Sequence, residues 1–174
     1  MLNLSPLSSE ERDLALRLAS ENDAVRRFLG QRFRAVLAEP TTLDRKQPDD
    51  CRQAAVAFYD YTTNRSLVAV VDLRSEEVLA VDDARVQFQL DSEEQKEAEE
   101  LAFEDDRARE FLRDRDMNPL TRLFFPPKAA THDPPHRYAI VFLRPNDNER
   151  RFAVVDLSDR EVVDFFDSEA ITAQ

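Results

Sequence analysis

The sequence predicts an α+β protein made of two tandem repeats, each with a helix broken in two that packs on a four-stranded antiparallel sheet. One observation is a repeated hairpin, because the Ala-Val-Val-Asp-Leu of Ala69–Leu73 returns at Ala153–Leu157, an offset of 84. Another is a repeated helix start, since Leu7–Glu11 aligns with Leu90–Glu94 at an offset of 83. Two matches in nearly the same register indicate an internal duplication.

The duplication divides the chain into a first domain at residues 1–83 and a second at residues 84–174. With 42% apolar residues, each repeat can bury a small core. The net charge of −12 argues against nucleic-acid binding, because a phosphate backbone would be repelled on average. A single glycine also excludes the glycine-rich loops that cradle phosphates.

Cysteine usage and hydropathy limit the class of protein further. Cys51 is alone, so the chain has neither a disulfide framework nor a thiolate metal cage. No basic leader with an apolar core begins the sequence, and no apolar run approaches the length of a membrane span. A soluble, cytoplasmic protein without membrane insertion is therefore expected.

Capping residues predict the helices of the first repeat. Ser8 and Glu11 have the spacing of a capping box, which predicts a helix over residues 9–21. Asp23 is the expected cap of a second, short helix over residues 24–31. The helical region is thus expected to be broken in two.

Alternating residues predict four strands after these helices. The first covers residues 33–39, because Pro40 is expected to end it. The second covers residues 52–61, and a hairpin follows over residues 66–83 with its turn at Arg74-Ser75. An antiparallel four-stranded sheet results.

The second repeat follows the same order. Asp91 is the expected helix cap and Glu94 its box partner, while Asp106 takes the place of Asp23. The expected strands are Leu120–Phe125, Arg137–Arg144, Arg150–Leu157 and Glu161–Phe166. Their hairpin turn is expected at Ser158-Asp159.

The order and spacing of several short motifs resemble a known family. These motifs are the capped helix at Leu7–Glu11, Glu39-Pro40, Arg52-x-Ala54, Phe58-Tyr59-Asp60-Tyr61, and Val71-Asp72-Leu73 followed by Val78. The chain resembles the pair of small N-terminal domains that precede the catalytic domain of copper amine oxidases. The resemblance covers nearly the whole chain and implies a cystatin-like fold in two copies.

The same resemblance implies no amine oxidase activity. Catalysis in that family needs a large β-sandwich, three histidine copper ligands and a tyrosine that becomes a quinone, whereas this chain has two histidines in total. None of the family's catalytic residues can be carried over to this sequence. A protein that is not an enzyme is expected.

A metal site has one candidate in the sequence. His132 and His136 lie in His-Asp-Pro-Pro-His, with Asp133 as a third ligand, and imidazole suits zinc or copper. The alternative is a pair of solvated loop histidines, because two prolines exclude helical i, i+4 geometry and a fourth ligand is not evident. The second interpretation is favoured, so no cofactor is predicted.

Other polar residues have structural interpretations. Asp72 and Asp156 occupy equivalent places in the two hairpins, where a carboxylate typically accepts hydrogen bonds from turn amides. Tyr59 and Tyr61 are interpreted as packing residues with their hydroxyls at the rim.

Strand parity predicts an interaction surface, because both faces of each sheet are apolar and the helices can cover one. In the second repeat the candidate residues are Tyr138, Ile140, Phe142, Phe152 and Val154. Another protein, a second copy or the other repeat is expected to cover them. The predicted function is a non-catalytic protein-interaction or assembly module. A small-ligand or metal-binding domain, using the His132 loop or a cleft between the repeats, is the alternative.

Overall fold

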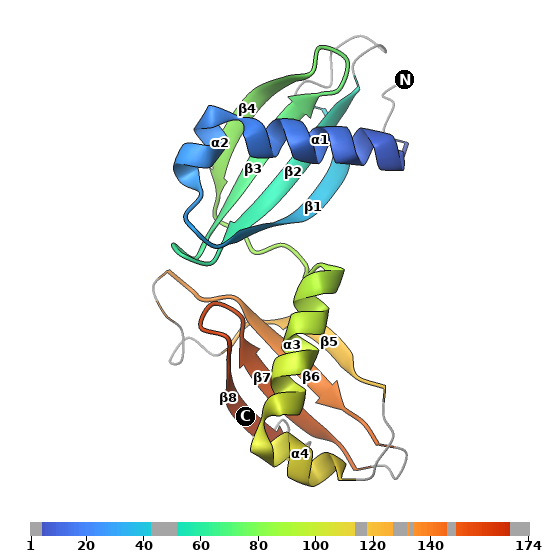
Figure 1. Cartoon of the computed structure of the whole chain (residues 1–174), viewed down its shortest axis with the longest axis vertical. Coiled ribbons are helices and arrows are strands. Elements are labelled where there is room, and N and C mark those ends of the chain that lie inside the picture. Colours follow the sequence, from blue (N-terminus) through green and yellow to red (C-terminus); the bar gives the residue numbers. More distant parts are fainter. Residues whose placement is uncertain are drawn as a thin grey trace. The chain divides into compact units, whose positions relative to one another are not determined.

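The computed structural model describes residues 5–42, 52–113, 118–126, 132, 134–145 and 149–167. The chain divides into two compact units, unit 1 at residues 1–88 and unit 2 at residues 89–174 (Figure 1). The sequence placed this boundary between residues 83 and 84, at the end of the last strand of unit 1. The structure assigns the residues that follow that strand to unit 1 as well.

In the described residues each unit has two helices followed by four strands, which confirms the α+β class and the tandem arrangement. Unit 1 contains α1 Ser9–Glu21, α2 Asp23–Phe28, β1 Phe33–Thr41, β2 Gln53–Asp60, β3 Arg65–Asp72 and β4 Glu77–Ala84. Unit 2 contains α3 Ser92–Glu104, α4 Asp106–Leu112, β5 Leu120–Phe124, β6 Tyr138–Leu143, β7 Arg151–Asp156 and β8 Glu161–Asp167. Both sheets are antiparallel, with strand orders β1-β2-β3-β4 and β5-β6-β7-β8.

The first helix of each unit begins at the predicted capping box. In α1 the Glu11 amide donates to Ser8 Oγ at 3.1 Å, and the Ser8 amide donates to Glu11 Oε2 at 2.8 Å. In α3 the same two bonds join Asp91 and Glu94 at 2.7 and 3.0 Å. A box formed by residues only three positions apart is a local structure, which explains why the sequence predicts it.

The predicted caps of the short helices are wrong by one residue. Asn22, not Asp23, caps α2, because its side-chain oxygen accepts hydrogen bonds from the amides of Ala24 and Val25. In unit 2 the cap of α4 is Asp105, one residue before Asp106. In both helices the residue after the cap, Asp23 or Asp106, is acidic and lies in the first turn, where the helix dipole stabilises its negative charge.

One strand prediction also needs correction. Pro40 does not end β1, which continues to Thr41; β1 is an edge strand, where a missing amide hydrogen costs little. The hairpin turns lie where they were predicted, since Arg74-Ser75 and Ser158-Asp159 are the central residues of turns over 73–76 and 157–160. Their last positions, Glu76 and Arg160, have φ angles of 55° and 62°, so each takes up a left-handed conformation without glycine.

The helices of each unit lie on one face of its sheet (Figure 1). In unit 1 the core between them includes Ala15 and Ala19 of α1, which have no exposed surface. Ala98 and Ala102 of α3 are equally buried in unit 2. Small side chains on this helix face allow the helix axis to approach the sheet closely. Among the described residues, no helix has the length and apolar content to cross a membrane.

The single glycine of the chain is needed for a close approach. A Cβ atom added to Gly30 would lie 2.6 Å from the Cβ of Thr62, in the turn after β2. The Gly30 amide donates to Asp60 Oδ2 at 3.0 Å, and Asp60 also accepts from the Thr62 amide at 2.9 Å. The segment after α2 is therefore attached directly to the β2–β3 turn.

Candidate functional site

The candidate site of unit 2 is built around Asp156, the last residue of β7. Its Oδ1 atom accepts hydrogen bonds from the amides of Ser158 and Asp159, at 2.8 and 3.1 Å. Asp72 binds the amides of Arg74 and Ser75 in the same way in unit 1. The turn interpretation of both aspartates is confirmed, and in unit 2 it leaves Oδ2 of a buried carboxylate for another partner.

His136 is that partner. Its Nδ1 lies 2.8 Å from Asp156 Oδ2 and 3.6 Å from Asp159 Oδ2. His136 lies just before β6, and β6 pairs with β7 so that Tyr138 is directly opposite Asp156. Strand register therefore brings the two residues together. The side chain of His136 is 13% exposed, so the solvated interpretation is wrong for this histidine.

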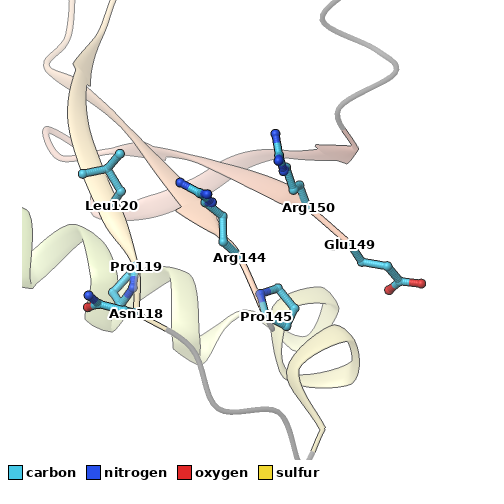
Figure 2. A pocket seen from close by; sticks show the side chains of 7 residues that line it. All are labelled: Asn118, Pro119, Leu120, Arg144, Pro145, Glu149 and Arg150. Atoms are coloured by element: carbon cyan, nitrogen blue, oxygen red, sulfur yellow. The ribbon is translucent and has the colours of Figure 1, made fainter. Parts of the chain in front are cut away.

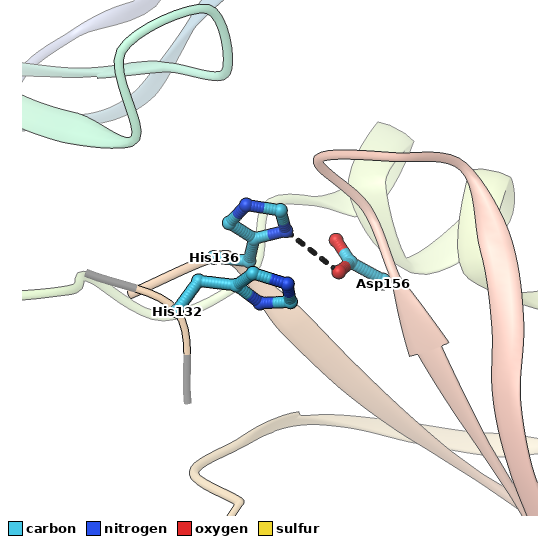
Figure 3. A group of neighbouring side chains, drawn as sticks. All are labelled: His132, His136 and Asp156. Carbon is cyan, nitrogen blue, oxygen red and sulfur yellow. Dashed lines mark hydrogen bonds and ion pairs between the residues drawn. The ribbon is translucent and has the colours of Figure 1, made fainter. Parts of the chain in front are cut away.

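His132 lies against His136. The two imidazole rings are stacked, with centroids 3.7 Å apart and an angle of 12° between their planes. Figure 3 shows both rings presenting an edge toward the carboxylate of Asp156. One donor atom from each of the three residues lies within 4.8 Å of the other two.

Tyr138 lies beside this group, directly opposite Asp156 in the β6–β7 pairing. Its hydroxyl lies 2.8 Å from His132 Nδ1. Burial, together with the nearby negative charge of Asp156, raises the pKa of Tyr138 to about 12. The phenol is therefore neutral over the physiological range and can orient His132 without adding charge.

The sequence anticipated part of this site. It paired His132 with His136, and the structure brings these two residues together, while Asp133, its third candidate, lies outside the described residues. Asp156 is the third member of the group in the structure. The identity of this third residue depends on the pairing of β6 with β7, and no spacing within the His-Asp-Pro-Pro-His motif could have revealed it.

Unit 1 has no equivalent group among its described residues. The pairing of Gln53 with Asp72 corresponds to the pairing of Tyr138 with Asp156. Gln53 is buried, and Cys51 takes the place of His136 by sequence alignment. Within the described ranges, the group therefore occurs in unit 2 and has no counterpart in unit 1.

The predicted interaction residues lie on the sheet face of unit 2 that the helices leave uncovered. Ile140, Phe152 and Val154 are 8%, 6% and 4% exposed, Tyr138 is 4% exposed, and Phe142 is half-buried. Phe152 packs against Phe142, at a centroid distance of 5.0 Å, and is stacked on Phe166 at 5.4 Å. Much of this apolar surface is therefore buried within the chain.

An open pocket of about 490 Å³ lies at the end of this face. It is lined by Asn118, Pro119, Leu120, Arg144, Pro145, Glu149 and Arg150. Figure 2 shows Arg144 and Arg150 extending to the same side as Leu120, while Glu149 points away. Leu120 is opposite Phe142 in the β5–β6 pairing, so the pocket continues the apolar face.

Unit 2 contains a buried ion pair that no pattern in the sequence predicted. Arg137 donates to both carboxylate oxygens of Glu94, and neither side chain has exposed surface. Arg137 also donates to the carbonyl of Gln89 at 3.1 Å. The capping-box glutamate therefore connects helix α3 to the start of strand β6.

The interpretation of the two tyrosines of unit 1 as packing residues is confirmed. Tyr59 and Tyr61 are buried, and their rings meet edge to face at 5.0 Å. The Tyr59 hydroxyl donates to Asn64 at 3.3 Å. These residues pack unit 1, and the guanidinium of Arg32 covers the ring of Tyr61 at 4.3 Å.

Comparison with known proteins gives no family assignment, because no family model and no curated protein matches this sequence.

Proposed function

We propose that this protein is a non-catalytic interaction module that binds an acidic segment of another protein at the pocket of unit 2. The observation that carries the proposal is a difference between the two sheets at equivalent positions. Unit 1 has Ala55 and Ala57 on β2 where unit 2 has Ile140 and Phe142 on β6. The sheet face of unit 2 opposite its helices is therefore more apolar than that of unit 1, and it is accessible at its edge, at Leu120.

The chemistry of the pocket supports an acidic partner. Arg144 and Arg150 are both exposed, whereas the chain as a whole carries a net charge of −12. Two guanidinium groups beside an apolar side chain suit a carboxylate that follows an apolar residue. Leu120, the apolar side chain of the pocket, is 37% exposed. Apolar contact would supply affinity, and the arginines would select charge and orientation.

The family resemblance supports the same function. In copper amine oxidases the similar domains accompany a catalytic domain, and this sequence carries none of its catalytic residues. A cystatin-like pair that retains an accessory role is consistent with such a resemblance. We propose this relationship on the sequence motifs alone.

Peptide selection tests the proposal. The full chain is used to select from a library of displayed peptides with free carboxyl termini. The affinity of each selected peptide is then measured by fluorescence anisotropy. We expect acidic peptides with an adjacent apolar residue. The double variant Arg144→Glu/Arg150→Glu should weaken binding by at least about tenfold, since each charge-assisted contact contributes about 1.5–3 kcal/mol.

The matched control is Arg12→Glu/Arg17→Glu, which changes the net charge equally on the exposed surface of α1. Equal weakening by both double variants would mean that only general electrostatics is involved, and the proposal would fail. It would also fail if no acidic peptide were selected. Light scattering shows whether a second copy can be the partner, by a mass increase that Arg144→Glu/Arg150→Glu abolishes.

A further inference from the structure

We propose that His132, His136 and Asp156 form a binding site for a transition-metal ion with the chemistry of Zn²⁺. This site uses none of the residues that line the pocket of the proposed partner site. Two imidazoles and a carboxylate are the ligand types that zinc takes up in proteins. Among the described residues, these three side chains offer ligand atoms that lie close enough to one another to share one ion.

The hydrogen bonds decide which atoms are available as ligands. The Nδ1 atom of His132 is occupied by the Tyr138 hydroxyl, which leaves its Nε2 atom for a metal. Nδ1 of His136 and Oδ2 of Asp156 are joined by one hydrogen bond at 2.8 Å, and a metal ion bound between them would take its place, with the ring hydrogen of His136 then on Nε2. Oδ1 of Asp156 remains on the turn amides, so the carboxylate is held in place.

The surroundings have the features of a prepared metal site. Tyr138 orients His132 through its second ring nitrogen, the position at which metal-binding histidines usually have a supporting partner. Asp156 is 1% exposed and the histidines lie on its solvent side, so an ion can enter from the exposed His132. Oδ2 of the exposed Asp159, at 3.6 Å from His136 Nδ1, can supply a fourth ligand.

The rings have to move when the ion binds. Zn–N and Zn–O bonds of about 2.0–2.1 Å place tetrahedral donors roughly 3.3 Å apart, whereas the present donors are separated by up to 4.8 Å. The rings are parallel, so their lone pairs lie side by side and a tilt of His132 is sufficient to bring them together. Binding should therefore break the histidine stack.

Metal titration of the full chain is the test. Calorimetry with Zn²⁺ should show one ion per chain. Co²⁺ should give the intense visible absorption of a tetrahedral site.

Two variants and a matched control make the test specific. His136→Ala and Asp156→Asn should each weaken Zn²⁺ binding by at least about tenfold. Asp72→Asn makes the same change in the equivalent turn of unit 1 and should leave binding unchanged. Asparagine keeps a side-chain oxygen for the turn amides, so both variants should fold, as circular dichroism would verify. Equal affinity in wild type and His136→Ala, or equal loss in Asp72→Asn, would overturn the proposal.

Discussion

The two units attach their first helix to the sheet with the same pair of residues, but only one unit buries the pair. In unit 1 Arg52 binds Glu11, with side-chain exposures of 12% and 31%. In unit 2 Arg137 binds Glu94, and both exposures are 0%. Both arginines stand immediately before the second strand of their sheet, and both glutamates belong to a capping box.

The pairs also share their additional contacts. Arg52 donates to the carbonyls of Ser5 and Pro6 before α1, at 2.9 and 3.0 Å, and Arg137 donates to the Gln89 carbonyl before α3. The same ion pair thus attaches the first helix to the sheet in both units. It joins a glutamate three residues after the helix cap to an arginine directly before the second strand. The contribution of this ion pair to stability depends on its burial. Water screens the charges of a partly exposed pair and can solvate either charge when its partner is lost, whereas a charge left alone in a buried pair has no such solvation.

The largest expected effect comes from breaking the buried pair. Arg137→Met should lower the free energy of unfolding of unit 2 by about 3–5 kcal/mol, because Glu94 would remain as an uncompensated buried charge. Arg52→Met should cost unit 1 about 1–2 kcal/mol. Native-state hydrogen exchange, which reports on each unit within the full chain, measures both losses.

The variant Glu94→Gln/Arg137→Met serves as the control for this comparison. Glutamine can keep its place in the capping box, and the buried charge is removed. The double variant should therefore recover much of the stability that Arg137→Met loses. Equal costs for Arg52→Met and Arg137→Met would show that burial does not distinguish the two pairs.

A second difference between the units concerns glycine, which only unit 1 contains. Gly30→Ala should destabilise unit 1 by about 1–3 kcal/mol, because the new methyl group would overlap the Thr62 side chain. Exchange protection in unit 2 should remain as it is in wild type. An unchanged unit 1 would mean that the turn carrying Thr62 moves away without cost.

The helix caps allow a smaller effect to be measured. Asn22→Ala should cost about 1 kcal/mol, because the amides of Ala24 and Val25 lose their acceptor. Asp23→Ala removes only a favourable charge in the first turn, at roughly 0.3–1 kcal/mol. Urea titrations of the two variants compare them directly. A greater loss for Asp23→Ala would restore Asp23 as the cap.

The smallest effect expected is a dependence on acid pH in unit 1. Hydrogen bonds from Arg52, and then from the Ser8 amide, lower the pKa of Glu11 from 4.5 to about 2. A lowered pKa stabilises the folded state above the unfolded pKa, and this contribution is lost as the pH falls from 4.5 towards 2. Unfolding measured across this range should show a shallower decline in Arg52→Met. An identical decline would assign the acid sensitivity to other carboxylates.

Local features of this protein were predictable from the sequence because they depend on residues close in the chain. The capping boxes at Ser8 and Asp91 join residues three positions apart, and the turn aspartates bind amides two and three positions ahead. The repeat followed from the same features, since each recurs at nearly one offset. The predicted cap of α2 was wrong because Asn22 and Asp23 are adjacent in the sequence and either residue type can cap a helix.

Tertiary structure alone decided the partners of Glu94 and His136. Glu94 meets Arg137 because α3 lies over the start of β6, and His136 meets Asp156 because β6 pairs with β7 in one register. A shift of one residue in that register would turn the opposed side chains to different faces of the sheet. The sequence contains the residues of both groups, but the distance between them is set only when helix and strands have packed.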